Sequence, residues 1–262
     1  MSHPPFDSDY EMIRSLGRGT FGAVWLARRL STDEIVAVKV FKYKEIALRE
    51  SEILKLLPLS VHLPRYIDLV KNNFLVTNYI PGEELYYAYT KYIFTPDMVH
   101  PMLIQMVETV KLLHDHHIVH RDIKIENIMY DINSRNLVLI DFDAAYHLDP
   151  GELVPRGTPG YVSPVLVQAY MNYKKDRTPL PTDRLLYEYS DIFALGVVFF
   201  ILTEECYPWK EWTHSKAGYD VYDWSSPVRP TYNDNKLVSI IQLMLQSHST
   251  ASNIIFELTI TN

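Results

Sequence analysis

The chain has 262 residues, of which 47% are hydrophobic and 22% charged, and its formal net charge is −7. This length suffices for one large core or for two lobes that share a cleft. A chain with a net negative charge lacks the excess of Lys and Arg that neutralises phosphates, which argues against a general nucleic-acid-binding protein. The single cysteine, Cys206, excludes an internal disulfide and favours a reducing compartment.

The sequence has no pattern of a secretory or membrane-spanning segment. Its first residues are polar and acidic, without the basic and apolar regions of a signal peptide. The longest strongly apolar run, at about 192–202, is shorter than the ~20 residues that span a bilayer, so we expect a buried core helix there. We therefore expect a cytoplasmic protein, with the nucleus or a host-cell cytoplasm as alternatives, and no membrane partner.

The first part of the chain has the pattern of a small β-sheet with one helix. Short segments that alternate or are rich in β-branched residues predict strands at 12–16, 23–27, 34–41 and 74–77. Before the last of these, apolar residues recur at helical spacing from Ile46 to Leu57, and Pro58 ends that pattern.

After a turn at Pro81 and Gly82 the pattern becomes mainly helical. Apolar periodicity predicts helices at 98–117, 191–203 and 236–246. For the roughly 25 residues between Val165 and Asp191 we expect a long loop, whose segment 173–177 is either a docking patch or solvated surface. The predicted fold is α+β, with a small antiparallel sheet lobe plus one helix and a larger, mainly α-helical lobe.

The chemistry of the chain concentrates in two nearby segments, His120-Arg121-Asp122-Ile123-Lys124-Ile125-Glu126-Asn127 and Asp141-Phe142-Asp143. Asp122 can accept a proton from an attacking hydroxyl, and Lys124 can offset negative charge on a transferring phosphate. Asn127 and Asp141 supply the oxygen ligands that Mg²⁺ prefers. This ordered set of groups predicts phosphoryl transfer.

Three glycines, Gly17, Gly19 and Gly22, lie between two predicted strands. Glycine lets the backbone N–H groups of a loop approach phosphates closely, although a plain β-turn has a similar composition. A position between two strands, rather than between a strand and a helix, argues against a dinucleotide site.

Taken in order, these motifs resemble those of the eukaryotic-type protein kinases, from about residue 10 to about residue 246. Lys124 and the segment Gly157-Thr158-Pro159-Gly160-Tyr161-Val162-Ser163-Pro164 resemble the Ser/Thr class rather than the tyrosine class. The resemblance implies a two-lobed protein-kinase-like fold. Its expected divisions are a tail (1–9) and a kinase domain (10–262) with small lobe (10–77), hinge (78–82) and large lobe (83–262).

The resemblance also implies ATP and Mg²⁺ as cofactors, and a monomeric enzyme that acts on Ser or Thr of a protein substrate and binds no nucleic acid. The catalytic residues that it implies are Asp122, Lys124, Asn127 and Thr158, and the metal ligands are Asn127 and Asp141. The ATP-binding residues that it implies are Leu16, Gly17, Arg18, Gly19, Thr20, Phe21, Gly22, Val24, Ala37, Lys39, Glu50, Thr77, Tyr79, Glu84, Met129 and Asp141.

The segment Val36-Ala37-Val38-Lys39 resembles the lysine motif of the family's third strand. Lys39 is expected to hold the α- and β-phosphates and to pair with a glutamate of the predicted helix. Glu50 is preferred over Glu52, because the residues after Glu50 match the family's apolar pair.

Other residues acquire roles from the resemblance around the adenine ring. Leu16 and Val24 are expected to enclose the ring, Met129 to form its floor and Thr77 to guard the pocket behind it. Backbone groups of the segment that contains Tyr79 are expected to bond the adenine.

Two acidic residues suggest which substrates are preferred. Glu84 and Glu126 align with carboxylates that contact a substrate arginine in basophilic kinases. We expect a basic residue two or three positions before the acceptor, unless both glutamates are merely solvated surface charges.

The sequence departs from the family pattern at Asp143, where a glycine is usual, and a residue with a side chain resists positive φ. We expect restricted movement of Phe142 and intact metal binding at Asp141. Val165 stands where the family has a glutamate, and Ser252 aligns with that glutamate's arginine partner. Because both ends of this ion pair are missing together, the fold should tolerate the loss.

Between Asp143 and Gly157 the only hydroxyl belongs to Tyr146. Many kinases with an arginine at the position of Arg121 need a phosphate on this loop to neutralise it. Asp149 and Glu152 could pair with Arg121 permanently, or packing alone could order the loop. Either way, we expect activity without loop phosphorylation.

Two rival functions fit parts of the sequence. A pseudokinase or scaffold would use the fold only for binding, and the changes at Asp143 and Val165 are its support. A small-molecule phosphotransferase would resemble His-Gly-Asp where this chain has His-Arg-Asp, and would lack the Gly-Thr-Pro-Gly-Tyr segment.

Overall fold

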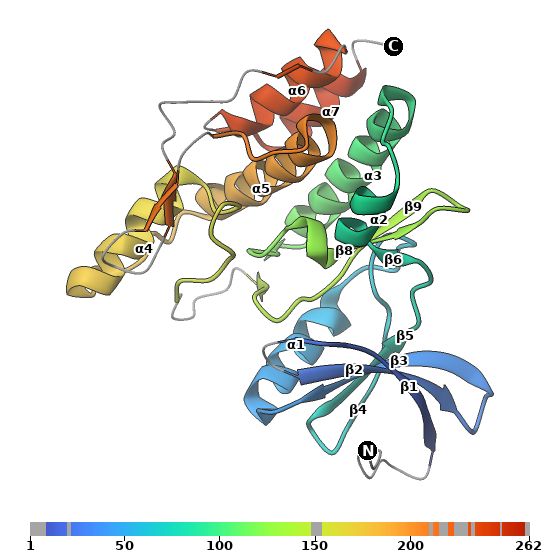
Figure 1. Cartoon of the computed structure of the whole chain (residues 1–262). Coiled ribbons are helices and arrows are strands. Elements are labelled where there is room, and N and C mark those ends of the chain that lie inside the picture. Colours follow the sequence, from blue (N-terminus) through green and yellow to red (C-terminus); the bar gives the residue numbers. More distant parts are fainter. Residues whose placement is uncertain are drawn as a thin grey trace.

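The computed structural model describes residues 9–19, 22–147, 154–209, 212–214, 220–222, 230–231, 234–246 and 248–259. These residues form two lobes, a β-sheet with one helix and a larger, mainly helical lobe, as the sequence predicts (Figure 1). Residues 79–82, between β5 (Phe74–Asn78) and β6 (Glu83–Glu84), connect the two lobes. The tail 1–8 lies outside the described residues.

The small lobe is an antiparallel sheet with the strand order β1-β2-β3-β5-β4. Its other strands are β1 (Tyr10–Arg18), β2 (Gly22–Arg29), β3 (Glu34–Phe41) and β4 (Tyr66–Val70). The valines Val36, Val38 and Val76 are buried together on one face, as expected for alternating strand residues. Sequence periodicity did not identify β4, whose residues are all half-buried and show no alternation.

Helix α1 (Lys44–Leu56) corresponds to the helix predicted in the small lobe, and it packs against β3, β4 and β5. It buries Ala47, Glu50, Ser51, Ile53 and Leu54, the spacing of one helix face. The next residue, Leu57, is extended because the residue before a proline is disfavoured in the helical region. The helix therefore directs Glu50 inward, toward the sheet.

The large lobe begins with β6 and contains most of the helices. Its other elements are α2 (Leu85–Lys91), α3 (Pro96–Asp115), β7 (Ile118–Val119), η1 (Ile125–Asn127), β8 (Ile128–Asp131), β9 (Asn136–Leu139), β10 (Tyr146–His147), α4 (Pro164–Asp176), α5 (Arg184–Glu204), β11 (Trp212–His214), β12 (Asp220–Tyr222), α6 (Asn235–Leu245) and α7 (Ala251–Thr259). Helices α3 and α5 lie side by side in its core, and α6 and α7 cover them on the side away from the sheet (Figure 1).

Helix α5 is longer than the apolar run that predicted it. Asp183 caps it by accepting a hydrogen bond from the Leu185 N–H at 3.0 Å, so that the helix begins at Arg184. With 21 residues it is long and apolar enough to cross a membrane, but 89% of its most apolar stretch is buried inside the protein. The expectation of a segment too short to span was therefore wrong about length, while α5 is the buried core helix that the sequence predicts.

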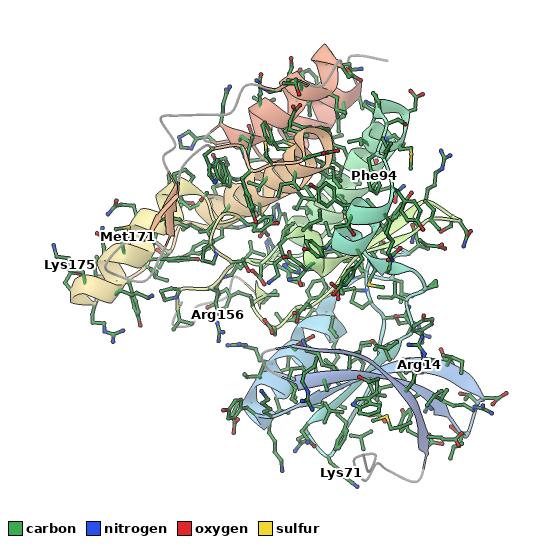
Figure 2. All side chains as sticks on the ribbon, in the orientation of Figure 1. Arg14, Lys71, Phe94, Arg156, Met171 and Lys175 are labelled. Atoms are coloured by element: carbon green, nitrogen blue, oxygen red, sulfur yellow. The ribbon has the colours of Figure 1, made fainter. Side chains whose placement is uncertain are left out.

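The long loop expected before Asp191 is also a correction, because residues 164–176 form α4 and residues 184–190 extend α5. Pro164 occupies the first turn of α4, where its missing N–H costs nothing. Leu166, Val167 and Tyr170 recur at helical spacing and are buried with Tyr187 of α5. The outer end of α4, marked by Lys175 in Figure 2, extends away from both lobes.

The fold tolerates the absence of the ion pair at Val165 and Ser252 because of where these two residues lie. Val165 lies on α4 with 40% of its surface exposed, and Ser252 is exposed on α7. Neither position buries a charge, so neither requires a partner.

Candidate active site

The ammonium group of Lys39, on β3, lies between carboxylates from both lobes. Its Nζ is 2.8 Å from Oε2 of Glu50 and 2.6 Å from Oδ1 of Asp141. The Glu50 side chain is only 5% exposed, whereas Glu52 points outward and is exposed. The ion pair predicted for Lys39 and Glu50 is therefore present, and Glu52 does not compete for it.

Burial and charge oppose each other within this group. Burial raises the pKa of Glu50 to about 7, although Lys39 works in the other direction. Burial also disfavours the charge on Lys39, but Glu50 and Asp141 outweigh it and raise the pKa of Lys39. For Asp141, burial would raise the pKa, but the Lys39 ammonium outweighs it and lowers the pKa. Two carboxylates around one ammonium leave an excess of negative charge, which favours a further cation.

The segment 141–143 takes a backbone conformation that removes the need for glycine. Asp141 has φ 65°, in the left-handed region, whereas Asp143 has no positive φ. The assumption of a positive φ at Asp143 is therefore wrong, whereas restricted movement of Phe142 stays a prediction. Phe142 is 1% exposed, and its ring meets the His120 ring edge to face at 4.8 Å. The Asp143 carbonyl accepts a hydrogen bond from Arg49 of α1 at 2.9 Å, a contact that the sequence did not suggest.

The carboxylate of Asp122 is held by three side chains. Oδ1 accepts a hydrogen bond from the Thr158 hydroxyl at 2.6 Å, and Oδ2 lies 2.9 Å from Nζ of Lys124 and 3.1 Å from Nδ2 of Asn127. Lys124 also donates to the Thr158 hydroxyl at 2.9 Å. Thr158 thus contacts both Asp122 and Lys124. Burial disfavours the charge on Lys124, but Asp122 outweighs it and raises the pKa of Lys124.

The residues expected to hold Mg²⁺ fit a hard cation. Asn127 uses its Nδ2 for hydrogen bonds to the Asp122 carbonyl at 2.9 Å and to the Asp122 carboxylate, so its Oδ1 is available as a ligand. Asp141 uses Oδ1 for Lys39, and Oδ2 is available in the same way. Within the described ranges no group of three or more His, Cys, Asp or Glu residues could hold a metal by itself. A magnesium ion here would therefore need oxygens from a bound phosphate as well.

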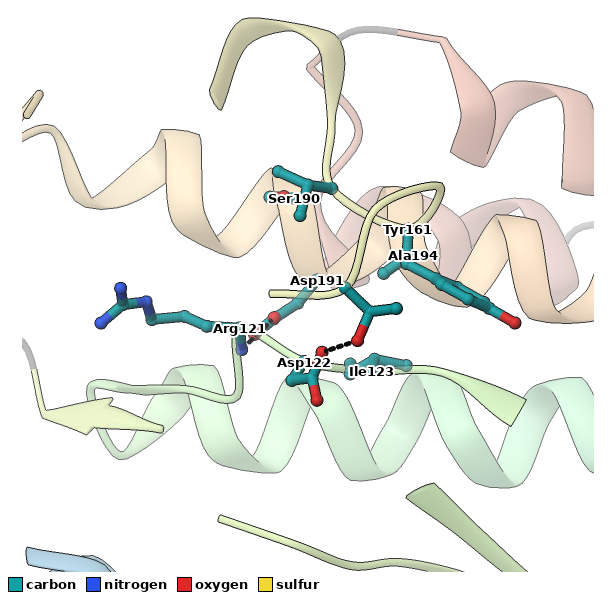
Figure 3. Close-up of a pocket in the computed structure, with 9 residues that line it drawn as sticks. Arg121, Asp122, Ile123, Tyr161, Ser190, Asp191 and Ala194 are labelled. Atoms are coloured by element: carbon teal, nitrogen blue, oxygen red, sulfur yellow. Dashed lines mark hydrogen bonds between the residues drawn. The ribbon is translucent and has the colours of Figure 1, made fainter. Parts of the chain in front are cut away.

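Asp191 of α5 orders the backbone at His120 and Arg121, and the sequence analysis missed this role. It is 1% exposed and accepts hydrogen bonds from the backbone N–H groups of His120 and Arg121, each at 2.8 Å. Its Oδ2 also lies 3.1 Å from Nε2 of His114. In Figure 3 the loop residues Arg121–Ile123 and Asp191 line a cavity of about 10 Å³, room for about one water. A lone acidic residue at the start of an apolar run was the available signal.

The glycine-rich segment forms the tip of the hairpin between β1 and β2. The Gly19 N–H donates to the Gly22 carbonyl at 2.9 Å, which closes the turn. Leu16, Gly17 and Arg18 at the end of β1 are exposed, and Gly17 pairs with Val24. Thr20 and Phe21, two of the predicted ATP-binding residues, lie outside the described residues.

The remaining predicted ATP-binding residues come from strands that the fold brings together. Ala37 pairs with Thr77 across β3 and β5. Met129 pairs with Glu84 across β8 and β6. Tyr79, half-buried, follows β5 in the connection between the lobes. These positions lie between residues 37 and 129 of the sequence and meet only because the strands pair.

The side chain of Arg121 turns away from Asp122 toward α4 and α5. Its Nη2 donates to the Val154 carbonyl, and its guanidinium carbon lies 5.8 Å from the ring centroid of Tyr146 and 5.9 Å from that of Tyr187. Asp149 and Glu152, the expected permanent partners of Arg121, lie outside the described residues, so that hypothesis stays a prediction.

Comparisons with known proteins agree with this geometry. The family model described as "Protein kinase domain" matches residues 10–251. The chain is 28% identical over 252 residues to "Probable serine/threonine-protein kinase MARK-C" of Dictyostelium discoideum, covering 90% of this chain and 30% of the relative. It is 31% identical over 221 residues to serine/threonine-protein kinase SCH9 of Saccharomyces cerevisiae, covering 77% and 24%.

A third relative is CBL-interacting serine/threonine-protein kinase 5 of Arabidopsis thaliana, 29% identical over 243 residues, covering 83% of this chain and 51% of the relative. The chain thus spans between 24% and 51% of the length of these three relatives. Because the family model matches nearly the whole chain, and these relatives are all named as serine/threonine kinases, the chain belongs to the eukaryotic-type protein kinases of the Ser/Thr class.

Proposed function

We propose that this domain transfers the γ-phosphoryl group of Mg·ATP to Ser or Thr hydroxyls of protein substrates. The observation that supports this proposal most is that the fold assembles two sets of polar side chains, one around Lys39 and one around Asp122. Lys39 and Glu50 of the small lobe meet Asp141 of the large lobe, and Asp122 is oriented by Thr158, Lys124 and Asn127.

In this proposal Lys39, fixed by Glu50, holds the α- and β-phosphates of the nucleotide. Asn127 and Asp141 hold Mg²⁺, which when bound neutralises charge on the phosphates. The glycine-rich hairpin covers the phosphates from above, and Leu16, Val24, Ala37 and Met129 contact the adenine from both lobes.

Asp122 performs the proton transfer. As the substrate hydroxyl oxygen bonds to phosphorus and the bond to the leaving oxygen of ADP breaks, Asp122 accepts the hydroxyl proton. Lys124, 2.9 Å from Asp122, offsets the negative charge on the transferring group. Thr158 fixes the carboxylate orientation through its hydrogen bond to Oδ1.

The finer substrate preference rests on Glu84 and Glu126. Burial raises the pKa of Glu84, and the charge of Glu126 adds to this, so the two carboxylates influence each other. Oε2 of Glu126 is buried without a hydrogen-bond partner among the described residues. An arginine or lysine of the substrate, two or three residues before the acceptor, would offset part of the charge of these two groups.

We also propose that activity does not need phosphorylation of the loop before Gly157. The support is that the Arg121 guanidinium already contacts a backbone carbonyl and two aromatic rings. A monomeric state and a cytoplasmic location remain our expectations from the sequence.

The experiment compares wild type with Asp122→Asn. Purified proteins receive radiolabelled ATP, Mg²⁺ and a library of Ser- and Thr-containing peptides, and nucleotide affinity is measured separately by calorimetry. We expect incorporation by wild type, with turnover on the order of 1–100 s⁻¹, and none by Asp122→Asn at unchanged nucleotide affinity. Equal incorporation by both proteins would refute the proposal. If wild type binds the nucleotide without transfer, a scaffold is favoured. A parallel assay offers aminoglycosides as acceptors, and transfer to them alone would favour a small-molecule phosphotransferase.

A further inference from the structure

The side chain of Arg121 is enclosed by tyrosines from three different elements. Tyr146 belongs to β10, Tyr170 to α4 and Tyr187 to α5. Tyr170 and Tyr187 are each 1% exposed, and both belong to the buried cluster that joins α4 to α5. This cluster depends on the helical form of residues 164–176 and 184–190, where the sequence predicted a loop.

Each tyrosine makes a different contribution to holding Arg121. The rings of Tyr146 and Tyr187 lie 5.8 Å and 5.9 Å from the guanidinium carbon, within the range of cation–π attraction. Tyr170 is buried beside Tyr187 in one cluster, and burial raises its pKa while the Arg121 side chain works in the other direction. The hydroxyl of Tyr187 donates to the Pro181 carbonyl at 2.8 Å, which fixes its ring.

Within the described part of the chain, these contacts stabilise the positive charge of Arg121. The Val154 carbonyl accepts from Nη2, while Nε is buried without a hydrogen-bond partner among the described residues. The faces of the two rings add electrostatic stabilisation, because aromatic rings present negative charge to a cation above them.

The position of Arg121 bears directly on Asp122, the next residue. Arg121 has φ 68°, a left-handed conformation that a residue with a side chain adopts only when its surroundings impose it. On one side, Asp191 holds its backbone N–H at 2.8 Å. On the other, the tyrosines and the Val154 carbonyl hold its side chain. Releasing the side chain would let the backbone relax and would turn Asp122 away from the substrate hydroxyl.

We propose that Tyr187, which packs with Tyr170, is a positioning residue that holds Arg121, and through it Asp122, in the working orientation without a phosphate. The inserted helical pair of α4 and the first turns of α5 thus performs the ordering that a loop phosphate would otherwise provide. This inference rests on the proposed kinase activity and deepens it by naming the groups that replace the phosphate.

The test uses enzyme treated with phosphatase and verified as unmodified by intact mass. Tyr187→Leu removes the ring, and Tyr187→Phe keeps the ring while removing the hydroxyl. Tyr173→Leu is the matched control, because Tyr173 packs against the same cluster but its ring contacts a different arginine. The guanidinium carbon of Arg177, rather than that of Arg121, lies 5.3 Å from the centroid of the Tyr173 ring. We expect about a tenfold lower kcat for Tyr187→Leu with little change in KM for ATP, and recovery of most of the rate in Tyr187→Phe. The control should keep the wild-type kcat.

A double-mutant cycle separates positioning from general stability. If Tyr187 acts through Arg121, Tyr187→Leu should have little effect on kcat in an Arg121→Ala background. An equal loss of kcat in both backgrounds would overturn the inference, and so would a normal kcat in Tyr187→Leu.

Thermal unfolding of the same variants tests the contact between Tyr187 and Arg121 even if the enzyme shows no measurable transfer. A Tm of the double variant that departs from the sum of the two single changes supports the contact, and additive changes overturn it. Absence of transfer by wild type would count against the proposed function, and the unfolding cycle would still report on Arg121 and Tyr187.

Discussion

The hydroxyl of Thr158 donates a hydrogen bond of 2.6 Å to Oδ1 of Asp122, across 36 residues of sequence. This bond ties the segment that contains Gly157 and Thr158 to the residue proposed as the base. It leaves the other oxygen, Oδ2, to accept from Lys124 and Asn127. The orientation of Asp122 therefore depends on a residue that contacts neither nucleotide nor metal in our proposal.

Thr158→Val should lower kcat roughly tenfold or more, because a hydrogen bond to a charged group contributes about 1.5–3 kcal/mol. The KM for ATP should stay near the wild-type value, since Thr158 lies beside the base rather than beside Lys39. Steady-state kinetics on a Ser/Thr peptide measures both constants. Thr158→Ser keeps the hydroxyl and is the control, and equal rates for Val and Ser variants would contradict the prediction.

The raised pKa of Glu50 predicts opposite pH trends for activity and stability. Burial raises this pKa to about 7 from an ordinary 4.5. In the free enzyme, protonation below pH 7 removes the charge that fixes Lys39, so kcat/KM for ATP should fall as the pH falls through about 7. A raised pKa means that the folded state binds the proton more tightly. The contribution of this tighter proton binding to the free energy of unfolding is therefore full below pH 4.5. It is lost as the pH rises through about 7.

Glu50→Gln isolates this titration from the others. The variant should lose the step near pH 7 in both the kcat/KM profile and the Tm profile, whereas Glu52→Gln, with its exposed side chain, should keep both. A wild-type profile that is flat between pH 5 and 8 would show that Glu50 does not titrate there.

Substrate selection should depend on the pair Glu84 and Glu126. Wild type profiled on a peptide library should prefer Arg or Lys two or three residues before the acceptor. Glu126→Gln should weaken that preference about tenfold, because a charge-assisted hydrogen bond contributes roughly 1.5–3 kcal/mol. Glu108→Gln removes the same charge from an exposed site on α3 and should leave the profile unchanged. A profile without basic preference, unaltered in Glu126→Gln, would rule out this role.

Removal of phosphate should not inactivate the enzyme. The loop between Asp143 and Gly157 contains no Ser or Thr, and Arg121 has contacts that do not involve phosphate. Phosphatase-treated protein, confirmed as unmodified by intact mass, should retain most of its initial rate. A large drop that re-phosphorylation restores would mean that a phosphate is required after all. Asp149→Ala with Glu152→Ala then tests whether these two acids contribute, since only in that case should activity fall.

The connection between the lobes should be sensitive to a single methyl group. Gly82 has φ 104°, and a Cβ there would lie 2.3 Å from the Tyr130 carbonyl oxygen. Gly82→Ala should therefore lower the free energy of unfolding by roughly 1–3 kcal/mol or more, measured by urea denaturation. Gly17→Ala is the matched control, because no atom lies within 4 Å of a Cβ at that position. Equal stability of the two variants would contradict the packing at Gly82.

The motifs of local sequence were sufficient for much of the candidate site. Lys39 lies on a strand of β-branched residues, and Glu50 lies on a helix whose apolar spacing fixes its inward face. The pairing of these two residues followed from the family resemblance, and the structure brings them within 2.8 Å. Asp191 was missed as a functional residue, because its role depends on backbone N–H groups 70 and 71 positions earlier in the chain.

The sequence by itself determined the two-lobed architecture and the residue types of the site, because periodicity, turn residues and motif order are local properties. Only the tertiary structure decided that residues 164–176 and 184–190 are helical and that Tyr187 lies against Arg121. It also decided that Asp141, rather than Asp143, takes the left-handed backbone conformation. The physical reason is that burial, ring contacts and backbone strain depend on segments that meet only after folding, and no single window of sequence contains both partners.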